Sequence, residues 1–227
     1  MGAMDTSWYL DVNRFARSTS WLHGFMHAYA LWAGIVVLAL LLVAGWWRSR
    51  RDGPRAVALA LWAGLGTVAA VGLNQPLLHL VGRRRPYDVL RGVEVLVPRA
   101  NDFTFPSDHA TAAGAVIVGL LLASRRGLAL LAAVVGLSLA FARVYVGAHY
   151  PGDVVAGLVF GGAVVLVLSP LARRILQPVV EWLGRGPLRP LVATGAPERP
   201  GAQAAACTRE DFSRGAGSPS ARAPGST

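Results

Sequence analysis

Two histidines stand in short polar clusters at the ends of long apolar runs. His109 closes "PSDH" (Pro106 to His109), and His149 lies within "RVYVGAHYPGD" (Arg143 to Asp153). Two histidines can serve as a nucleophile and a general acid. Asp153 follows four residues after His149, where a carboxylate can hold the imidazole in one tautomer and stabilise the cation that develops. These residue types indicate nucleophilic catalysis.

A third cluster, "GRRRPYD" (Gly82 to Asp88), adds cations. Arg85 in this cluster and Arg143 in the third motif carry planar sets of N–H donors, which suit phosphate oxygens. Ser107 precedes a predicted helix, whose first backbone N–H groups can also bind an anion. The one cysteine, Cys207, lies in a polar tail, and no cluster offers a set of metal ligands. The sequence therefore predicts phosphoryl transfer that needs neither a metal nor another cofactor.

The composition of the whole chain is typical of a membrane protein. Of its 227 residues, 54% are hydrophobic and 15% are charged, whereas soluble domains have about 25% charged residues. A span needs about 20 apolar residues, and five segments meet or approach that length. They are Ala28 to Trp47, about Ala56 to Val81, about Ser107 to Ser124, Gly127 to about Tyr145, and Asp153 to about Leu171. The predicted fold is an all-α bundle of about five transmembrane helices.

Five alternating spans bring the three polar clusters to the same membrane surface. The connections on the other side carry eight arginines: Arg48, Arg50, Arg51, Arg55, Arg125, Arg126, Arg173 and Arg174. The positive-inside rule makes that side cytoplasmic, so the clusters are expected on the extracytoplasmic face of the plasma membrane. Membrane topology explains the arginine clusters that give the chain its net charge of +10. We therefore expect membrane lipids as partners and no nucleic acid. The sequence says nothing of the oligomeric state.

Three further features complete the expected organisation. Before the first span, apolar residues at helical spacing predict an interfacial amphipathic helix. Gly157 and Gly161 form a small-xxx-small pair that predicts close helix packing. Residues 1–177 are expected to form the membrane domain, with residues 178–227 as a disordered cytoplasmic tail.

The motifs carry a resemblance to a known family. "RP" in the first cluster, "PSDH" in the second and "R-x5-H-x3-D" in the third resemble the signature motifs of the type 2 phosphatidic acid phosphatase (PAP2) superfamily. The match covers roughly Asn74 to Gly157. The aspartate of "PSDH" is similar to the bacitracin-resistance type of undecaprenyl pyrophosphate phosphatase. The resemblance implies a membrane lipid phosphatase, acting on a polyprenyl (undecaprenyl or decaprenyl) diphosphate or phosphate during cell-envelope synthesis.

The resemblance also implies residue roles. His149 would attack phosphorus and form a phosphohistidine, Asp153 would orient it, and His109 would protonate the leaving oxygen. The substrate phosphate would be held by Arg85, Arg143 and Ser107, with Asp108, Arg83 and Pro86 as further binding residues. Two alternatives stay open: a phosphatase for phosphatidic acid or phosphatidylglycerol phosphate, and a non-catalytic lipid-phosphate transporter or binder.

One position departs from the family pattern. The first motif of the family begins with a lysine seven residues before its arginine, and that position here is Leu78. Arg83, Arg84 or His79 could supply the missing cation from another place on the backbone. If the helix ran on unbroken, residues 78 and 85 would lie on nearly the same face, about 10.5 Å apart along its axis.

Overall fold

The computed structural model describes residues 2–193, and these residues form helices with no β-strand among them. In chain order the α-helices are α1 (Ala3–Ser18), α2 (His23–Ala28), α3 (Gly34–Ser49), α4 (Pro54–Val81), α5 (Pro86–Val89), α6 (Asp108–Leu122), α7 (Arg126–Tyr145), α8 (Pro151–Leu183) and α9 (Arg189–Val192). A 3-10 turn, η1 (Ser20–Leu22), and a π-helical turn, η2 (Tyr29–Ala33), join α2 to its neighbours.

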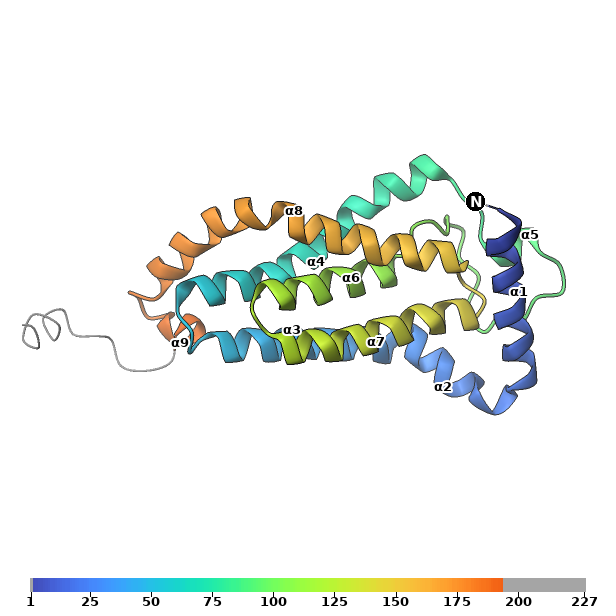
Figure 1. Cartoon of the computed structure of the whole chain (residues 1–227), viewed down its shortest axis with the longest axis horizontal. Coiled ribbons are helices and arrows are strands. Elements are labelled where there is room, and N and C mark those ends of the chain that lie inside the picture. Colours follow the sequence, from blue (N-terminus) through green and yellow to red (C-terminus); the bar gives the residue numbers. More distant parts are fainter. Residues whose placement is uncertain (1, 194–227) are drawn as a thin grey trace, which may run out of the picture. The chain divides into compact units, whose positions relative to one another are not determined.

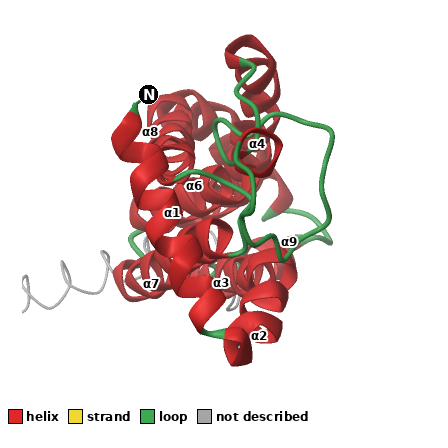
Figure 2. Cartoon of the chain, turned by 90° about the vertical axis from the view of Figure 1, so that its right-hand side faces the viewer, coloured by secondary structure: helices red, strands yellow, loops and turns green. Residues whose placement is uncertain are grey.

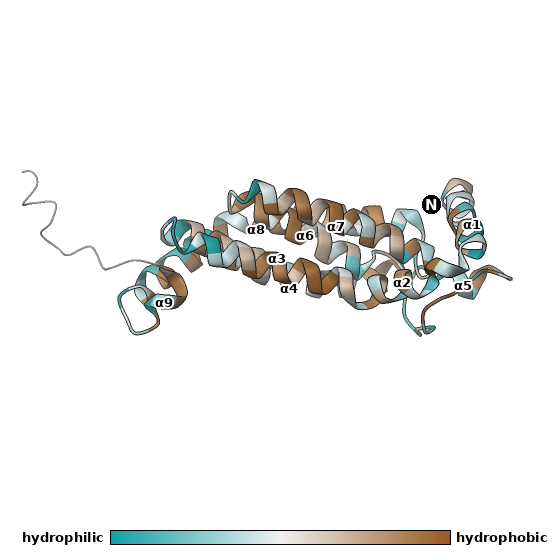
Figure 3. Ribbon diagram, turned by 90° about the horizontal axis from the view of Figure 1, so that it is seen from below, coloured by the Kyte–Doolittle hydropathy of each residue, from teal (hydrophilic) through white to brown (hydrophobic). Residues whose placement is uncertain are grey.

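The predicted membrane bundle is confirmed, with changed boundaries. Within residues 2–193, four helical stretches are long and apolar enough to cross a membrane: Ser20–Ser49, Pro54–Val89, Arg126–Tyr145 and Pro151–Leu183. The first and last extend well beyond the spans expected from the sequence. The third predicted span, about Ser107 to Ser124, is the shorter apolar helix α6, whose 15 residues give a length of about 22 Å at 1.5 Å per residue. Hydrophobic residues predominate along the middle of these helices, and hydrophilic residues are more frequent towards their ends and on α1 (Figure 3).

Helix α6 occupies the centre of the bundle, with α3, α4, α7 and α8 packed around it (Figures 1 and 2). Glycines let α6 and α8 approach closely. A Cβ on Gly114 would lie 2.0 Å from the carbonyl oxygen of Leu158, and one on Gly161 would lie 1.9 Å from that of Thr111. A Cβ on Gly157 would lie 2.6 Å from the carbonyl oxygen of Ser107. The predicted packing role of the glycine pair is confirmed, and it brings the start of α8 beside the start of α6.

The predicted N-terminal amphipathic helix is α1, which runs across one end of the bundle (Figure 1). It buries Tyr9, Asn13 and Ala16 against the bundle, while Trp8 and Phe15 on another side stay exposed. No part of α1 belongs to the four membrane-spanning stretches. The polar side chains of α1 therefore lie outside the membrane-spanning stretches, beside the connections at that end of the bundle.

The expected C-terminal boundary needs correction. Residues 178–183 continue α8, and residues 189–192 form α9. Val180 and Val192 pack with Val57 and Ala58 at the start of α4, so ordered structure extends past residue 177 because these side chains complete a small apolar core. The rest of the predicted disordered tail, residues 194–227, lies outside the described residues.

The connections at the far end of the bundle from α1 contact one another. Arg125, between α6 and α7, binds the side chains of Ser49 and Asp52 at the α3–α4 connection. Nη1 of Arg50 donates to the carbonyl oxygen of Pro190 at 2.7 Å. The arginine-rich connections predicted to share one side thus lie together.

Candidate active site

The three polar clusters meet at the end of the bundle crossed by α1 and surround a cavity of about 310 Å³. The first cluster contributes Arg85, the second Asp108 and His109, and the third Arg143 and His149. Apolar side chains line the rest of the cavity, among them Leu31, Leu78, Val97, Pro98 and Phe103. The cavity thus combines cations and two imidazoles with an apolar wall, which suits a phosphate joined to an apolar group.

His149 lies in the connection between α7 and α8 and is 3% exposed. Its Nδ1 is 2.9 Å from the carbonyl oxygen of Thr104, and its Nε2 is 3.2 Å from Nη2 of Arg143. A carbonyl oxygen can only accept a hydrogen bond, so Nδ1 carries the ring proton and Nε2 accepts from the guanidinium. Nε2 is therefore the ring nitrogen with the lone pair.

The charge state of His149 follows from its surroundings. Burial, with the positive charges of Arg143 and Arg85, holds the pKa of His149 well below its usual range. The imidazole is consequently neutral near pH 7, since the ordinary histidine pKa is about 6.5. A neutral imidazole is the form that can act as a nucleophile.

Asp153 does not contact His149 in the way that the sequence predicted. Its Oδ2 is 3.8 Å from Nδ1 of His149, which is too far for a direct hydrogen bond. The hydroxyl of Thr104 lies between them, 2.6 Å from Oδ2 of Asp153 and 3.0 Å from Nδ1 of His149. The expected direct contact is therefore replaced by a contact through Thr104.

Thr104 was missed by the sequence analysis. It sits two residues before Pro106 in "TFPSDH", and a lone threonine there gives no chemical signal of its own. The structure gives it three roles: its carbonyl binds Nδ1 of His149, its hydroxyl binds Asp153, and its N–H donates to the carbonyl oxygen of Arg83 at 2.9 Å.

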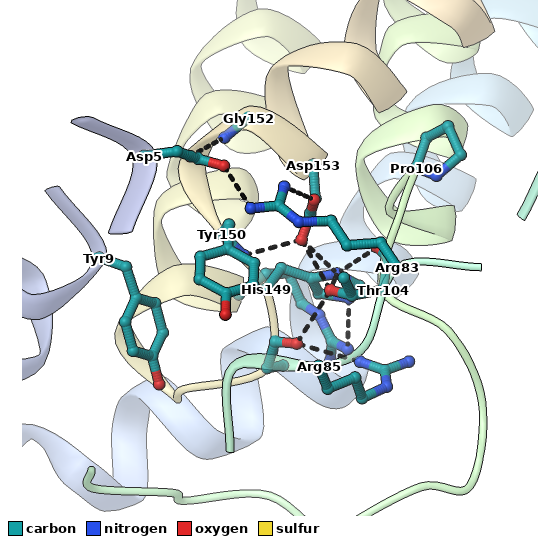
Figure 4. Close-up of polar contacts among 12 residues, drawn as sticks. Asp5, Tyr9, Arg83, Arg85, Thr104, Pro106, His149, Tyr150, Gly152 and Asp153 are labelled. Carbon is teal, nitrogen blue, oxygen red and sulfur yellow. Dashed lines mark hydrogen bonds and ion pairs between the residues drawn. The ribbon is translucent and has the colours of Figure 1, made fainter. Parts of the chain in front are cut away.

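The position of Arg83 differs from the prediction that it binds the substrate phosphate. It does not line the cavity. Its Nη1 is 2.6 Å from Oδ1 of Asp153, and its Nη2 is 2.6 Å from Oδ2 of Asp5 in α1 (Figure 4). The guanidinium also lies 3.9 Å from the centre of the Tyr150 ring. With its donors directed at two carboxylates, Arg83 supports Asp153 rather than replacing the missing lysine of the motif.

Arg85 and Arg143 remain as the predicted phosphate-binding cations. Arg85 donates to Asp102 at 2.6 Å and to the carbonyl oxygen of Ala148 at 3.1 Å. Burial raises the pKa of Asp102, but the hydrogen bond and charge of Arg85 outweigh it, so the net pKa is lowered. Arg143 is 7% exposed, and its Nε has no hydrogen-bond partner in the described chain. An oxyanion in the cavity would meet both guanidinium groups.

The second cluster is held by α4 and α8. Asp108 Oδ1 accepts from Asn74 Nδ2 at 2.7 Å and from Gln75 Nε2 at 3.0 Å. The backbone N–H of Ser107 donates to the carbonyl oxygen of Asp153 at 3.1 Å. The hydroxyl of Ser107 is buried and has no partner among residues 2–193. Asn74 and Gln75 are further residues that the sequence analysis did not connect with the site.

The first cluster departs from the expected helical geometry. Helix α4 ends at Val81, and the chain turns at Gly82, whose φ is 61°. The helix is therefore not continuous from Leu78 to Arg85, so helical spacing does not relate the two residues, although both line the cavity. Pro86 begins the short helix α5 and lies outside the residues that line the cavity. A proline restricts the residue before it to extended backbone, and Arg85 has this conformation, with φ −68° and ψ 152°.

Among residues 2–193, no group of three or more His, Cys, Asp or Glu side chains is placed to hold a metal ion.

Comparisons with known proteins agree with this geometry. The sequence model of the PAP2 superfamily matches residues 59–176. Undecaprenyl-diphosphatase BcrC of Bacillus subtilis is 34% identical over 155 residues, covering 66% of this chain and 75% of that protein. The undecaprenyl-diphosphatase of Sulfolobus acidocaldarius is 32% identical over 127 residues, covering 56% of this chain and 57% of that protein.

A solved structure supports the fold independently. The crystal structure of a transmembrane PAP2-type phosphatidylglycerolphosphate phosphatase from Bacillus subtilis is similar with a TM-score of 0.56 at 23% identity, covering 77% of this chain and 89% of that chain. The fold and the site thus define a membrane-embedded lipid phosphatase. The chain belongs to the PAP2 superfamily.

Proposed function

We propose that this protein hydrolyses a polyprenyl diphosphate or phosphate through a phosphohistidine at His149. The observation that carries the proposal is the position of Nε2 of His149, unprotonated and 3.2 Å from Arg143 in a cavity shared with Arg85 and His109. A nucleophile beside two cations and a second imidazole can catalyse phosphoryl transfer through a covalent intermediate. The similarity to two undecaprenyl-diphosphatases supports the choice of a polyprenyl substrate.

In the first step, the lone pair of Nε2 attacks the terminal phosphorus. The P–N bond forms while the bond from phosphorus to the bridging oxygen breaks, and His109 gives that oxygen a proton. A diphosphate then releases the lipid monophosphate, and a monophosphate releases the lipid alcohol. Arg85 and Arg143 stabilise the charge on the phosphoryl oxygens, while Thr104 and Asp153 hold the imidazole that becomes positively charged.

In the second step, water attacks the phosphohistidine. His109, now unprotonated, accepts a proton from the water. The P–N bond breaks, its electron pair returns to Nε2, and inorganic phosphate leaves. Burial and the charge of Arg143 lower the pKa of His109 to about 3, so we infer that His109 takes up its proton together with the anionic substrate, whose negative charge offsets the nearby cations. The cycle ends with His149 neutral and His109 protonated again.

The apolar wall supports a lipid substrate. Leu31 comes from the π-helical turn of the first membrane stretch and Leu78 from α4. These side chains border the polar end of the cavity, where the first isoprene units of a polyprenyl chain would lie. The arginine-rich connections lie at the opposite end of the bundle, so we place the cavity at the extracytoplasmic face of the plasma membrane.

Phosphate release by the purified full-length protein tests the proposal. Undecaprenyl diphosphate, undecaprenyl phosphate, phosphatidic acid and phosphatidylglycerol phosphate are compared in one detergent, with His149→Ala as the blank. We expect the highest kcat/KM with a polyprenyl substrate. A preference for phosphatidic acid or phosphatidylglycerol phosphate would overturn the substrate assignment. Binding of these lipids without turnover would identify a binder or transporter instead.

The side of the membrane is tested by cysteine labelling in a variant with Cys207→Ser. Asn101 and Arg126 are both exposed, one in the loop before α6 and the other at the start of α7. We expect Asn101→Cys to react with a membrane-impermeant thiol reagent on intact cells and Arg126→Cys to react only after lysis. The reverse pattern would place the cavity at the cytoplasmic face.

A further inference from the structure

The N-terminal helix α1 packs on the α7–α8 connection that contains His149. Tyr9 is fully buried, its ring centre is 5.4 Å from that of Tyr150, and its hydroxyl is 3.4 Å from the carbonyl oxygen of Gly147. Nδ2 of Asn13 donates to the carbonyl oxygen of Glu94 at 2.8 Å. Helix α1 therefore docks on both the α7–α8 connection and the loop before α6.

Asp5, in the first turn of α1, binds one group in the first turn of α8 and one in the α4–α5 connection (Figure 4). Its Oδ1 accepts from the backbone N–H of Gly152 at 2.8 Å, and its Oδ2 is 2.6 Å from Nη2 of Arg83. The Asp5 side chain is 12% exposed and that of Arg83 is 17% exposed. Contacts of this length between mostly buried charged groups are charge-assisted hydrogen bonds with a defined geometry.

Arg83 in turn holds Asp153, whose side chain is fully buried. A buried carboxylate is stable only when charges and hydrogen bonds compensate for its lost hydration. Arg83 supplies one contact to Oδ1, while Thr104 and the backbone N–H of Tyr150 bind Oδ2 at 2.6 and 2.8 Å. An unbroken series of contacts thus leads from Asp5 through Arg83, Asp153 and Thr104 to His149.

We propose that Asp5 is a positioning residue for phosphoryl transfer. It holds the Arg83 guanidinium and the first turn of α8, so that Asp153 keeps Oδ2 on the Thr104 hydroxyl and Thr104 keeps the imidazole aligned. This proposal rests on the function proposed above. Asp5 does not line the cavity, so it acts on the rate of the chemical step rather than on substrate binding.

Asp5→Asn in the full-length protein is the first test. Asparagine can still accept from Gly152 N–H, but it loses the charge that pairs with Arg83. We expect kcat to fall about 10- to 100-fold, the range for a small misalignment of reacting groups, with KM changed less than about twofold. The matched control is Asp11→Asn on the same helix, where the side chain is 53% exposed and pairs with Arg14; kcat should not change.

A double-mutant cycle separates positioning from general stabilisation. If Asp5 acts through Asp153, Asp5→Asn should cost little further rate in an Asp153→Asn background. Equal losses in both backgrounds, or no loss from Asp5→Asn alone, would overturn the proposal.

A spectroscopic readout keeps this test independent of the enzymatic activity. The ¹⁵N signals of His149, assigned by comparison with His149→Ala, should shift or broaden in Asp5→Asn and stay unchanged in Asp11→Asn. Unchanged signals in Asp5→Asn would contradict the positioning role. Failure of the wild-type protein to release phosphate would instead contradict the proposed function, while the spectra would still report on Asp5.

Discussion

The two ends of the helix bundle use the same residue type in different ways. At the cavity end, Arg83, Arg85 and Arg143 are mostly buried, and each directs its guanidinium at a carboxylate, a carbonyl or an imidazole. At the other end, seven arginines of the described residues are exposed: Arg48, Arg51, Arg55, Arg126, Arg173, Arg174 and Arg185. There Arg50 stacks on Trp47 with its guanidinium 3.6 Å from the ring centre.

Burial and partners distinguish the two sets where composition cannot. An exposed arginine contributes charge that needs no particular geometry, which is enough to orient a membrane protein. A buried arginine must have its donors satisfied, and its position is then fixed by its partners. Substitutions of the buried arginines at the cavity end should therefore change catalysis, and substitutions of the exposed arginines at the other end should leave it unchanged.

The largest contrast is expected between the histidines of the cavity and an arginine at the other end. His149→Ala removes the proposed nucleophile, so phosphate release should fall to background. His109→Ala should lower kcat about 10²- to 10⁴-fold, the usual cost of losing a general acid. Arg126→Ala should keep wild-type kcat and KM. Steady-state phosphate release in detergent measures all three variants, and near-normal turnover of either histidine variant would show that the roles are wrongly assigned.

Thr104 should come next in size. Thr104→Val keeps the shape of the side chain and the backbone carbonyl but removes the hydroxyl between Asp153 and His149. We expect kcat to fall about 10- to 100-fold from misalignment, and Thr104→Ser should recover most of the rate because it restores the hydroxyl. Equal activity of the valine and serine variants would mean that Asp153 does not act through this hydroxyl.

The pH dependence of kcat/KM should reflect the two cations beside His149. Its folded-state pKa is depressed, so the imidazole stays neutral as the pH falls below the ordinary value of about 6.5. The acid limb assigned to the nucleophile should therefore lie below about pH 6.5. Arg85→Gln removes one of these charges and should move the limb to higher pH. A limb that stays in place would contradict the electrostatic role of Arg85.

The smallest effect is expected at Leu78, the position of the lysine in the family motif. Leu78 is 4% exposed and lines the cavity with Arg85. A lysine here would add a charged hydrogen bond, worth about 1.5–3 kcal/mol, less the cost of burying its ammonium group. We expect KM to fall or stay constant, with the larger gain for a diphosphate. Inactivation of a folded Leu78→Lys protein would instead show that this wall must be apolar for the lipid.

The sequence predicted that the polar motifs converge, because their spacing is tied to helix geometry. Polar motifs at the ends of alternating apolar helices must meet at one surface, and Arg85, His109, Arg143 and His149 do line one cavity. The glycine pair on α8 was also informative, since a Cβ at either position would strike the backbone of the neighbouring segment at α6.

The sequence could not predict contacts between segments that are far apart in the chain. Asp5 and Arg83 are 78 residues apart, and Thr104 and Asp153 are 49 apart. Neither Asp5 nor Thr104 belongs to a recognisable pattern, and their importance follows from where α1 and the loop before α6 dock. Arg83 was misassigned for the same reason: its neighbours in sequence suggested phosphate, but its neighbours in space are Asp5 and Asp153.

The most direct test of the central claim is to trap the covalent intermediate. Rapid quenching of the purified protein with a polyprenyl diphosphate labelled in its terminal phosphate should yield an acid-labile, base-stable phosphate on the peptide that contains His149. The label should appear before steady-state release of phosphate and should be absent from His149→Ala. Normal turnover with no label at His149, or with the label on another residue, would contradict nucleophilic catalysis by this histidine.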